Sequence, residues 1–243
     1  MSGHSHYAGI KHKKSATDAQ RGKAFSKLTR EIAVAAREGG NPDFNPKLRI
    51  AIEKAKEMNM PKENIERAIK RGTGEIAGEK LEEFIFEAYG PGKVAIIIEG
   101  ITNNKNRTLA EIKQILNQNN GKLAKSGSVR WLFERKGCIV VDSQNQSENF
   151  KHKENLELAA IEAGADNIYW HDGFLDIYTN IEELEKVKNN LENQGINIES
   201  ASLDWVAKDL IEIEKKDKEA CQKLFEALDE SDSVQEIYSN LKV

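Results

Sequence analysis

Residues 82–102 read Glu-Glu-Phe-Ile-Phe-Glu-Ala-Tyr-Gly-Pro-Gly-Lys-Val-Ala-Ile-Ile-Ile-Glu-Gly-Ile-Thr, a pattern that indicates two paired β-strands. In the first half, Phe84, Phe86 and Ala88 alternate with charged or smaller residues, which is the period of a half-buried strand. The second half, residues 93–101, is a continuous run rich in β-branched side chains. Because a Gly-Pro-Gly turn separates the two halves, we predict an antiparallel hairpin.

Helical and strand-like segments alternate after this hairpin. We predict helices over 107–119, 156–163, 181–191 and 219–228, and strands over 129–134, 138–141, 168–170, 174–178, 198–206, 210–213 and 234–238. Short strands and helices that alternate through antiparallel connections are typical of α+β units of the ferredoxin-like kind.

The residues before the hairpin predict three helices. The first begins at the capping box 17–20 and runs to residue 37 or 38, where Gly39-Gly40 ends it. The second begins at Asn45-Pro46, with asparagine as the N-cap and proline at the first helical position. The third covers 62–71. None of the three can bury its apolar stripe alone, so we predict an N-terminal three-helix bundle.

Length and composition predict a soluble, highly charged protein of one to three domains. The chain has 243 residues, of which 31% are charged, against roughly 25% in an average domain. No apolar run reaches the roughly 18 residues of a membrane span, and the first residues lack the apolar core of a signal peptide. We therefore expect a cytoplasmic protein with no membrane partner. Cys138 and Cys221 show neither metal-binding spacing nor a disulfide framework, and both are expected to be buried free thiols.

The formal net charge of −4 conceals a strong asymmetry along the chain. Residues 1–75 contain 16 lysines and arginines against 9 aspartates and glutamates, an excess of seven positive charges. Residues 76–243 contain 20 basic and 31 acidic residues, an excess of eleven negative charges. A basic segment on an acidic body points to nucleic-acid contact, although membrane surfaces and acidic proteins attract the same kind of patch.

The basic charge is concentrated on an N-terminal arm and on one face of the first helix. Phe25, Leu28 and Ile32 lie on the opposite face of that helix, which is expected to pack. Lysine and arginine neutralise phosphates, and aromatic rings stack on bases. An ordinary solvated helix face is the alternative for the helix alone. The candidate nucleic-acid-binding residues are Tyr7, Lys11, His12, Lys13, Lys14, Arg21, Lys23, Lys27, Arg30, Arg37, Asn104 and Arg107.

The last two candidates belong to the polar loop 103–108, which could present amide and guanidinium groups to phosphates or base edges. Capping of the following helix by Asn106 explains this loop almost as well. His4, His6 and His12 lack a carboxylate or cysteine partner, so we predict no metal site. The chain also lacks the phosphate-binding, nucleophile-elbow and zinc-protease motifs, and we predict a protein that is not an enzyme and holds no cofactor.

Several of these segments, read together, resemble the YebC/PmpR family, which includes mitochondrial translational activators of cytochrome oxidase synthesis. They occur in family order across nearly the whole chain. The chain departs from the family at His6-Tyr7, where Lys-Trp is usual, so one charge is lost and the ring is smaller. The matching stretches are residues 1–14, 59–72, 89–92, 103–108, 126–129 and 234–240.

The resemblance implies an α+β protein in which an N-terminal three-helix bundle is followed by two ferredoxin-like α+β domains, one inserted in the other. Mapped onto this chain, the domains are residues 1–78, residues 79–135 with 207–243, and the inserted residues 136–206. Family members are mostly described as DNA-binding transcriptional regulators, and others act on the ribosome to assist translation through stalling sequences. Both roles require a site for a polyanion.

Three hypotheses follow for the function. The first is a DNA-binding transcriptional regulator, although no helix-turn-helix spacing is visible. The alternative is a translation factor bound to the ribosome through ribosomal RNA, because irregular RNA suits the ring and cations of the arm. The third is a scaffold in which the basic segment docks on an acidic lobe of another copy. We favour the nucleic-acid-binding regulator; the sequence does not specify the oligomeric state, and we expect a monomer.

Overall fold

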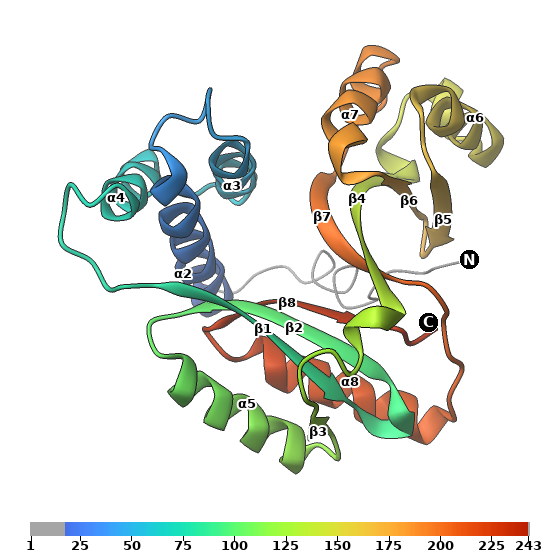
Figure 1. Cartoon of the computed structure of the whole chain (residues 1–243). Helices are drawn as coiled ribbons and strands as arrows, with labels where there is room; N and C mark the ends of the chain where they lie inside the picture. The colour runs from blue at the N-terminus through green and yellow to red at the C-terminus, as the bar shows by residue number, and fades with distance from the viewer. Residues whose placement is uncertain (1–17, 243) are drawn as a thin grey trace. The chain divides into compact units, whose positions relative to one another are not determined.

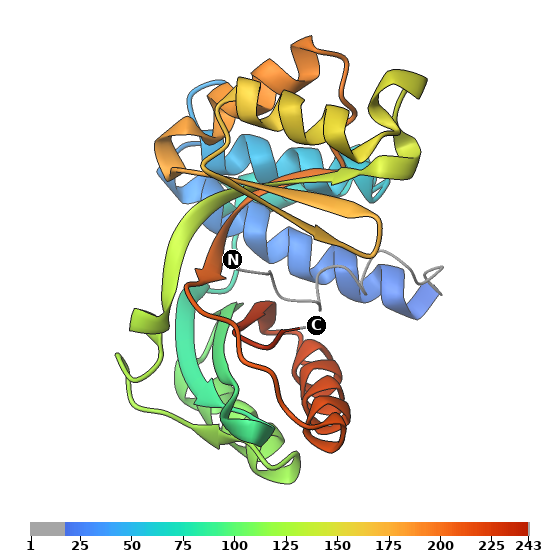
Figure 2. The same cartoon turned by 90° about the vertical axis from the view of Figure 1, so that its right-hand side faces the viewer.

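The structure is a computed structural model that describes residues 18–242, with side chains from residue 21 onward. Within these residues the chain forms seven α-helices and two four-stranded antiparallel sheets (Figures 1 and 2). The prediction of a mixed α+β protein is therefore confirmed. The chain divides into two compact units, residues 132–210 and residues 18–131 with 211–242. The predicted division into three domains stays a prediction, because the N-terminal helices and the first sheet fall in one unit.

Three helices form at the N-terminal end where the sequence predicts them. They are α2 (Asp18–Ala35), which continues as a 3₁₀ turn (Ala36–Glu38), α3 (Pro46–Glu57) and α4 (Lys62–Gly72). The Asn45 side chain accepts a hydrogen bond from the amide of Leu48, so the predicted N-cap of α3 is confirmed. The helices share one apolar core that includes Ile32, Leu48 and Ala68.

The first sheet is built on the predicted hairpin. It contains β1 (Glu82–Tyr89), β2 (Ala95–Thr102), β3 (Lys122–Leu123) and β8 (Val234–Ser239) in the order β3-β1-β2-β8. Two helices, α5 (Lys105–Gln118) and α8 (Lys215–Asp229), lie on the same side of this sheet (Figure 1). Alternate residues of β1 and β2 face these helices, which gives a core that includes Phe84, Ile96, Ile112 and Leu224.

The second sheet belongs to residues 132–210. It contains β4 (Phe133–Asp142), β5 (Asn167–His171), β6 (Phe174–Thr179) and β7 (Ser200–Ala207) in the order β5-β6-β4-β7. The helices α6 (Lys153–Ala163) and α7 (Leu184–Asn193) contribute buried residues, Leu156 and Val187 among them, to one core with this sheet. Cys138 on β4 and Cys221 on α8 are buried and not paired, so the prediction of free thiols is confirmed.

The structure differs from the predicted strands in two places. Residues 210–213, predicted as a strand, form none, and Ile211 makes only an isolated bridge with Leu241. The sequence predicts separate strands over 129–134 and 138–141, but residues 130–132 form a 3₁₀ turn and β4 is continuous from Phe133 to Asp142. In the sequence, Gly137 resembles a residue that ends a strand. Instead it lies in the middle of β4, between Thr179 of β6 and Leu203 of β7. A Cβ atom at this position would lie 2.3 Å from the Thr179 hydroxyl, so glycine is required by close packing and not by a turn.

Candidate nucleic-acid interface

The basic arm lies outside the described residues. Tyr7, Lys11, His12, Lys13 and Lys14 therefore stay predictions. Arg21, on the first turns of α2, is the first predicted residue whose side chain the structure describes, and it is exposed.

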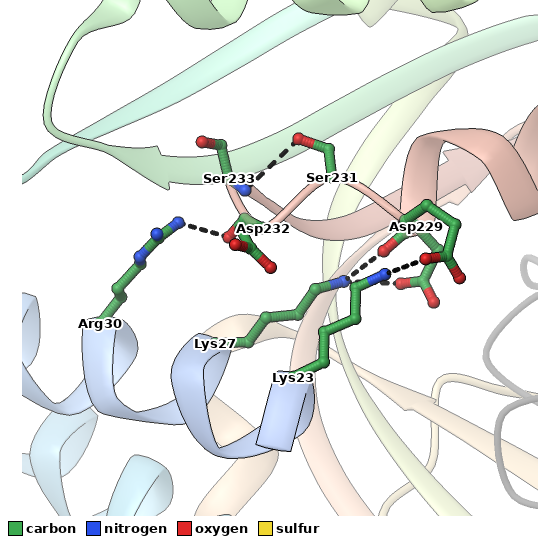
Figure 3. A network of polar contacts seen from close by, with 8 residues as sticks. Lys23, Lys27, Arg30, Asp229, Ser231, Asp232 and Ser233 are labelled. Carbon is green, nitrogen blue, oxygen red and sulfur yellow. Dashed lines mark hydrogen bonds and ion pairs between the residues drawn. The ribbon is translucent and has the colours of Figure 1, made fainter. Parts of the chain in front are cut away.

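Three of the predicted cations of α2 contact the segment that joins α8 to β8, residues 229–233, which we call the acidic loop (Figure 3). The ammonium group of Lys27 lies 2.7 Å from Oδ1 of Asp229, and it also donates to the carbonyl oxygen of that residue. Lys23 forms an ion pair with Glu230 at 3.0 Å. Arg30 donates a hydrogen bond to the carbonyl oxygen of Asp232.

These contacts correct the expected row of solvent-facing cations. Only 6% of the surface of Lys27 is exposed, and its charge is neutralised by Asp229 within the same chain. The sequence pattern placed Lys27 correctly on the polar face of α2, but helical periodicity cannot show that a loop some 200 residues later covers that face.

The basic side chains of α2 and α4 meet in an open groove between the two helices. This groove has a volume of about 860 Å³. Arg30 and Arg37 line it from α2 and the 3₁₀ turn that follows, and Arg67 and Arg71 line it from α4. Phe25 and Ala68 contribute apolar surface, and Ser26, Thr29 and Asn64 add polar groups. Four arginines therefore line one groove, and the guanidinium of one of them, Arg30, donates to the carbonyl oxygen of Asp232.

The charge of this arginine groove is not balanced locally. Glu79 is the one carboxylate among the described residues that line it, and its side chain accepts a hydrogen bond from Asn103 at 2.6 Å. The side chains of Arg37, Arg67 and Arg71 form no hydrogen bond or ion pair with any described residue. A guanidinium group that forms no bond within the protein can bind an external anion. Its planar N–H donors match the geometry of phosphate oxygens.

The close approach of α4 to α2 depends on Gly72, the last residue of α4. A Cβ atom there would lie 2.3 Å from the carbonyl oxygen of Ala33 and 2.6 Å from the Cβ atom of Ala36. Only glycine allows the backbones to come this close. The glycine therefore sets the position of Arg71 relative to α2.

Sequence reasoning missed Arg67 and Arg71. They stand four residues apart, the spacing that places two side chains on the same face of a helix. That spacing was a usable signal, but the isolated pattern does not show that α4 packs beside α2.

The polar loop 103–108 connects to the rim of the groove. Asn104 caps α5 by accepting a hydrogen bond from the amide of Arg107 at 3.0 Å, so the cap is Asn104 and not Asn106. The Arg107 guanidinium donates to the side-chain oxygen Oδ1 of Asn103 at 2.7 Å, and the side-chain nitrogen Nδ2 of the same asparagine donates to Glu79. The side chains of Asn104 and Arg107 are thus used in local contacts, and their role toward a nucleic acid stays a prediction.

Other kinds of site receive no support in the described part of the chain. Across residues 18–242, no group of three histidine, cysteine, aspartate or glutamate side chains could hold a metal ion. No described helix is both long enough and apolar enough to cross a membrane.

Comparison with family models gives two matches that together span most of the chain. Residues 5–75 match the model described as the TACO1/YebC protein N-terminal domain. Residues 81–241 match the model described as the TACO1/YebC second and third domain.

Full-length relatives share about half of their residues with this chain. A protein of Halothermothrix orenii is 48% identical, with 100% of this chain and 96% of the relative covered, and a protein of Aquifex aeolicus is 50% identical with the same coverage. Both are named probable transcriptional regulatory protein. A crystal structure of a conserved hypothetical protein from Aquifex aeolicus superposes with a TM-score of 0.89 at 48% identity and covers 98% of this chain and 97% of that one.

Proposed function

The chain belongs to the TACO1/YebC family, and from this premise we propose that it is a transcriptional regulator that binds DNA through the arginine groove between α2 and α4. The relatives named above are described as regulators and not as enzymes, which supports a regulatory role. The proposal includes a cytoplasmic location, where such a regulator meets its nucleic acid.

The observation that carries this proposal is the unbalanced charge of the groove. Arg37, Arg67 and Arg71 are fixed on two packed helices, with their guanidinium groups available to an external anion. A nucleic-acid backbone carries regularly spaced phosphates, and several arginines in one groove can contact neighbouring phosphates at once. The excess of seven positive charges over residues 1–75 would add attraction at longer range.

This geometry supports binding to the backbone more directly than reading of a base sequence. Contacts with phosphates set the position of a protein on DNA but carry no sequence information. Phosphate contacts also make affinity strongly dependent on salt, because binding releases condensed counterions. We therefore expect the described part of the chain to supply the electrostatic contribution to the affinity for DNA.

The test is titration of the full chain with labelled nucleic acids, followed by fluorescence anisotropy at several salt concentrations. The arms are a promoter duplex, a scrambled duplex of the same length and a ribosomal RNA stem-loop. Binding to both duplexes that is tighter than binding to the stem-loop and weakens steeply with salt supports the proposal, and tighter binding to the promoter duplex adds the sequence preference of a regulator. Equal, weak binding to both duplexes with tight binding to the stem-loop overturns it in favour of a ribosomal RNA partner, and absence of binding in all arms overturns it altogether.

A further inference from the structure

We propose that the exposed ring of Trp131, held beside Tyr89, forms a second contact site that stacks on an unpaired base of a single-stranded nucleic acid. This site lies on the segment that follows α5 and is made of residues other than those of the arginine groove. It rests on the proposed nucleic-acid binding and extends it from the phosphates of a duplex to the unpaired bases of a single strand.

The two rings are tied to a single backbone atom. The indole Nε1 of Trp131 donates a hydrogen bond to the carbonyl oxygen of Ser128 at 3.0 Å, and the hydroxyl of Tyr89 donates to the same oxygen at 3.2 Å. The polar ends of both rings are thus satisfied within the protein. Trp131 nevertheless remains 66% exposed and Tyr89 37% exposed, so much of the tryptophan and part of the tyrosine contact solvent.

The backbone that carries these rings is held by a buried carboxylate. Glu87 on β1 is only 3% exposed, and its two oxygens accept hydrogen bonds from the amides of Gly127, Val129 and Arg130. A loop with three amides bound to one buried carboxylate has little freedom to turn its exposed tryptophan into the protein. An aromatic side chain that is both exposed and fixed loses little conformational entropy when a ligand stacks on it.

The stretch of chain that carries Trp131 has a net positive charge. Residues 112–133 contain no aspartate or glutamate, whereas the chain beyond residue 75 is acidic overall. The same stretch carries four cations, of which Lys122 pairs with Tyr89 across β1 and β3. Lys125 is exposed on the turn before the tryptophan. The Arg130 side chain is 42% exposed, but its Nε lies 3.8 Å from Oε1 of Glu87 and is paired with that buried carboxylate.

Exposed aromatic rings interleaved with lysine and arginine are typical of surfaces that bind single-stranded nucleic acids. Every unpaired base has a π-face that stacks on such a ring, and the neighbouring cations neutralise the flanking phosphates. A base inside a duplex is already stacked on its neighbours and offers no free face. The site is therefore expected to select unpaired bases with little preference for sequence.

The experiment separates base stacking from phosphate binding. The full chain is titrated with a labelled oligoadenylate of about 12 nucleotides, within the site sizes of single-strand-binding folds, and with a strand of the same length that lacks its bases. We expect Trp131→Ala to weaken binding of oligoadenylate at least about fivefold, the minimum for one lost stacking contact. The same substitution should leave binding of the base-free strand unchanged. Trp131→Phe should retain most of the affinity.

Intrinsic fluorescence gives a second measurement that a merely structural role would not change. The chain has three tryptophans, of which Trp131 is the one with high exposure. Oligoadenylate should quench the emission of the wild type and not that of Trp131→Phe, which keeps a ring for stacking but lacks an indole.

The outcomes distinguish this inference from the proposed function. Equal affinity of wild type and Trp131→Ala for oligoadenylate overturns the stacking site, even if both proteins bind duplex DNA through the groove. A loss of affinity for the base-free strand as large as that for oligoadenylate also overturns it, because the substitution would then act on phosphate binding or folding. Absence of binding to every nucleic acid by the wild type overturns both proposals.

Discussion

The ammonium group of Lys27 on α2 lies 2.7 Å from Oδ1 of Asp229 and 3.1 Å from the carbonyl oxygen of the same residue, which stands 202 positions later in the chain (Figure 3). This contact joins the N-terminal helices to the end of α8. The most buried cation of α2 therefore serves internal structure, whereas Arg37, Arg67 and Arg71 of the arginine groove pair with no described residue.

Replacement of Lys27 by methionine should destabilise the protein. The substitution keeps the apolar stem but removes the ammonium group that pairs with Asp229, whose side chain is 22% exposed, at a cost of about 1–3 kcal/mol. Lys23→Met is the matched control, because Glu230 is 82% exposed and its ion pair is worth about 0–1 kcal/mol. Chemical denaturation followed by circular dichroism measures both variants. Equal stability of Lys27→Met and wild type would show that the contact does not hold the helices in place.

Glu87 should make stability depend on pH in the acidic range. Burial opposes its ionisation, but hydrogen bonds from Val129, Gly127 and Arg130 and the charge of Arg130 outweigh burial and lower the pKa below 4.5. A lowered pKa stabilises the fold above the ordinary glutamate value, and this stability is lost as pH falls through the folded-state pKa. Glu87→Gln should therefore cost about 1–3 kcal/mol at neutral pH, and less as the pH falls below about 4.

The control for this prediction is Glu83→Gln, an exposed residue of β1. Urea unfolding of the two variants and the wild type across the acidic range gives the comparison. A gap between Glu87→Gln and wild type that stays constant with pH would contradict the assigned role of the charge.

Gly72→Ala should disturb the packing of α4 against α2. The new methyl group would clash with the carbonyl of Ala33 and the side chain of Ala36, so overpacking should cost about 1–3 kcal/mol and weaken DNA binding by shifting Arg71. Gly22→Ala is the opposite case, because Gly22 lies inside α2 with no atom near the new methyl group. That variant should gain about 0.4–1 kcal/mol. Thermal unfolding of both variants measures the two effects, and a neutral Gly72→Ala would contradict the described contact.

The elements with strong local signals could be predicted from the sequence. The N-cap at Asn45, the hairpin around Gly90 and the third helix all form where they were expected, because capping groups, turn residues and periodicity act over a few neighbouring positions. The continuous β4 could not be recognised. The need for glycine at position 137 comes from Thr179, a residue of another strand.

The candidate site was predictable only in part, for the same physical reason. Periodicity placed Lys27 and Arg37 on the polar face of the first predicted helix. It could not show that Asp229 neutralises Lys27 or that Arg37 lines a groove. Arg67 and Arg71 line the groove only because α4 packs beside α2. Contacts between segments distant in sequence depend on the assembled fold, which local patterns do not contain.

The central claim is that the arginine groove binds the phosphate backbone of DNA. The most direct test is the affinity of Arg67→Gln/Arg71→Gln for a labelled duplex, measured between about 50 and 200 mM salt. Its control is Lys62→Gln/Lys70→Gln, which removes two charges from exposed positions of α4 outside the described lining of the groove. We predict that the arginine variant loses at least about tenfold in affinity, and that the slope of log affinity against log salt falls by about 0.9 for each lost contact. The lysine control should stay close to wild type. Equal losses in the two variants, or none in the arginine variant, would contradict the account.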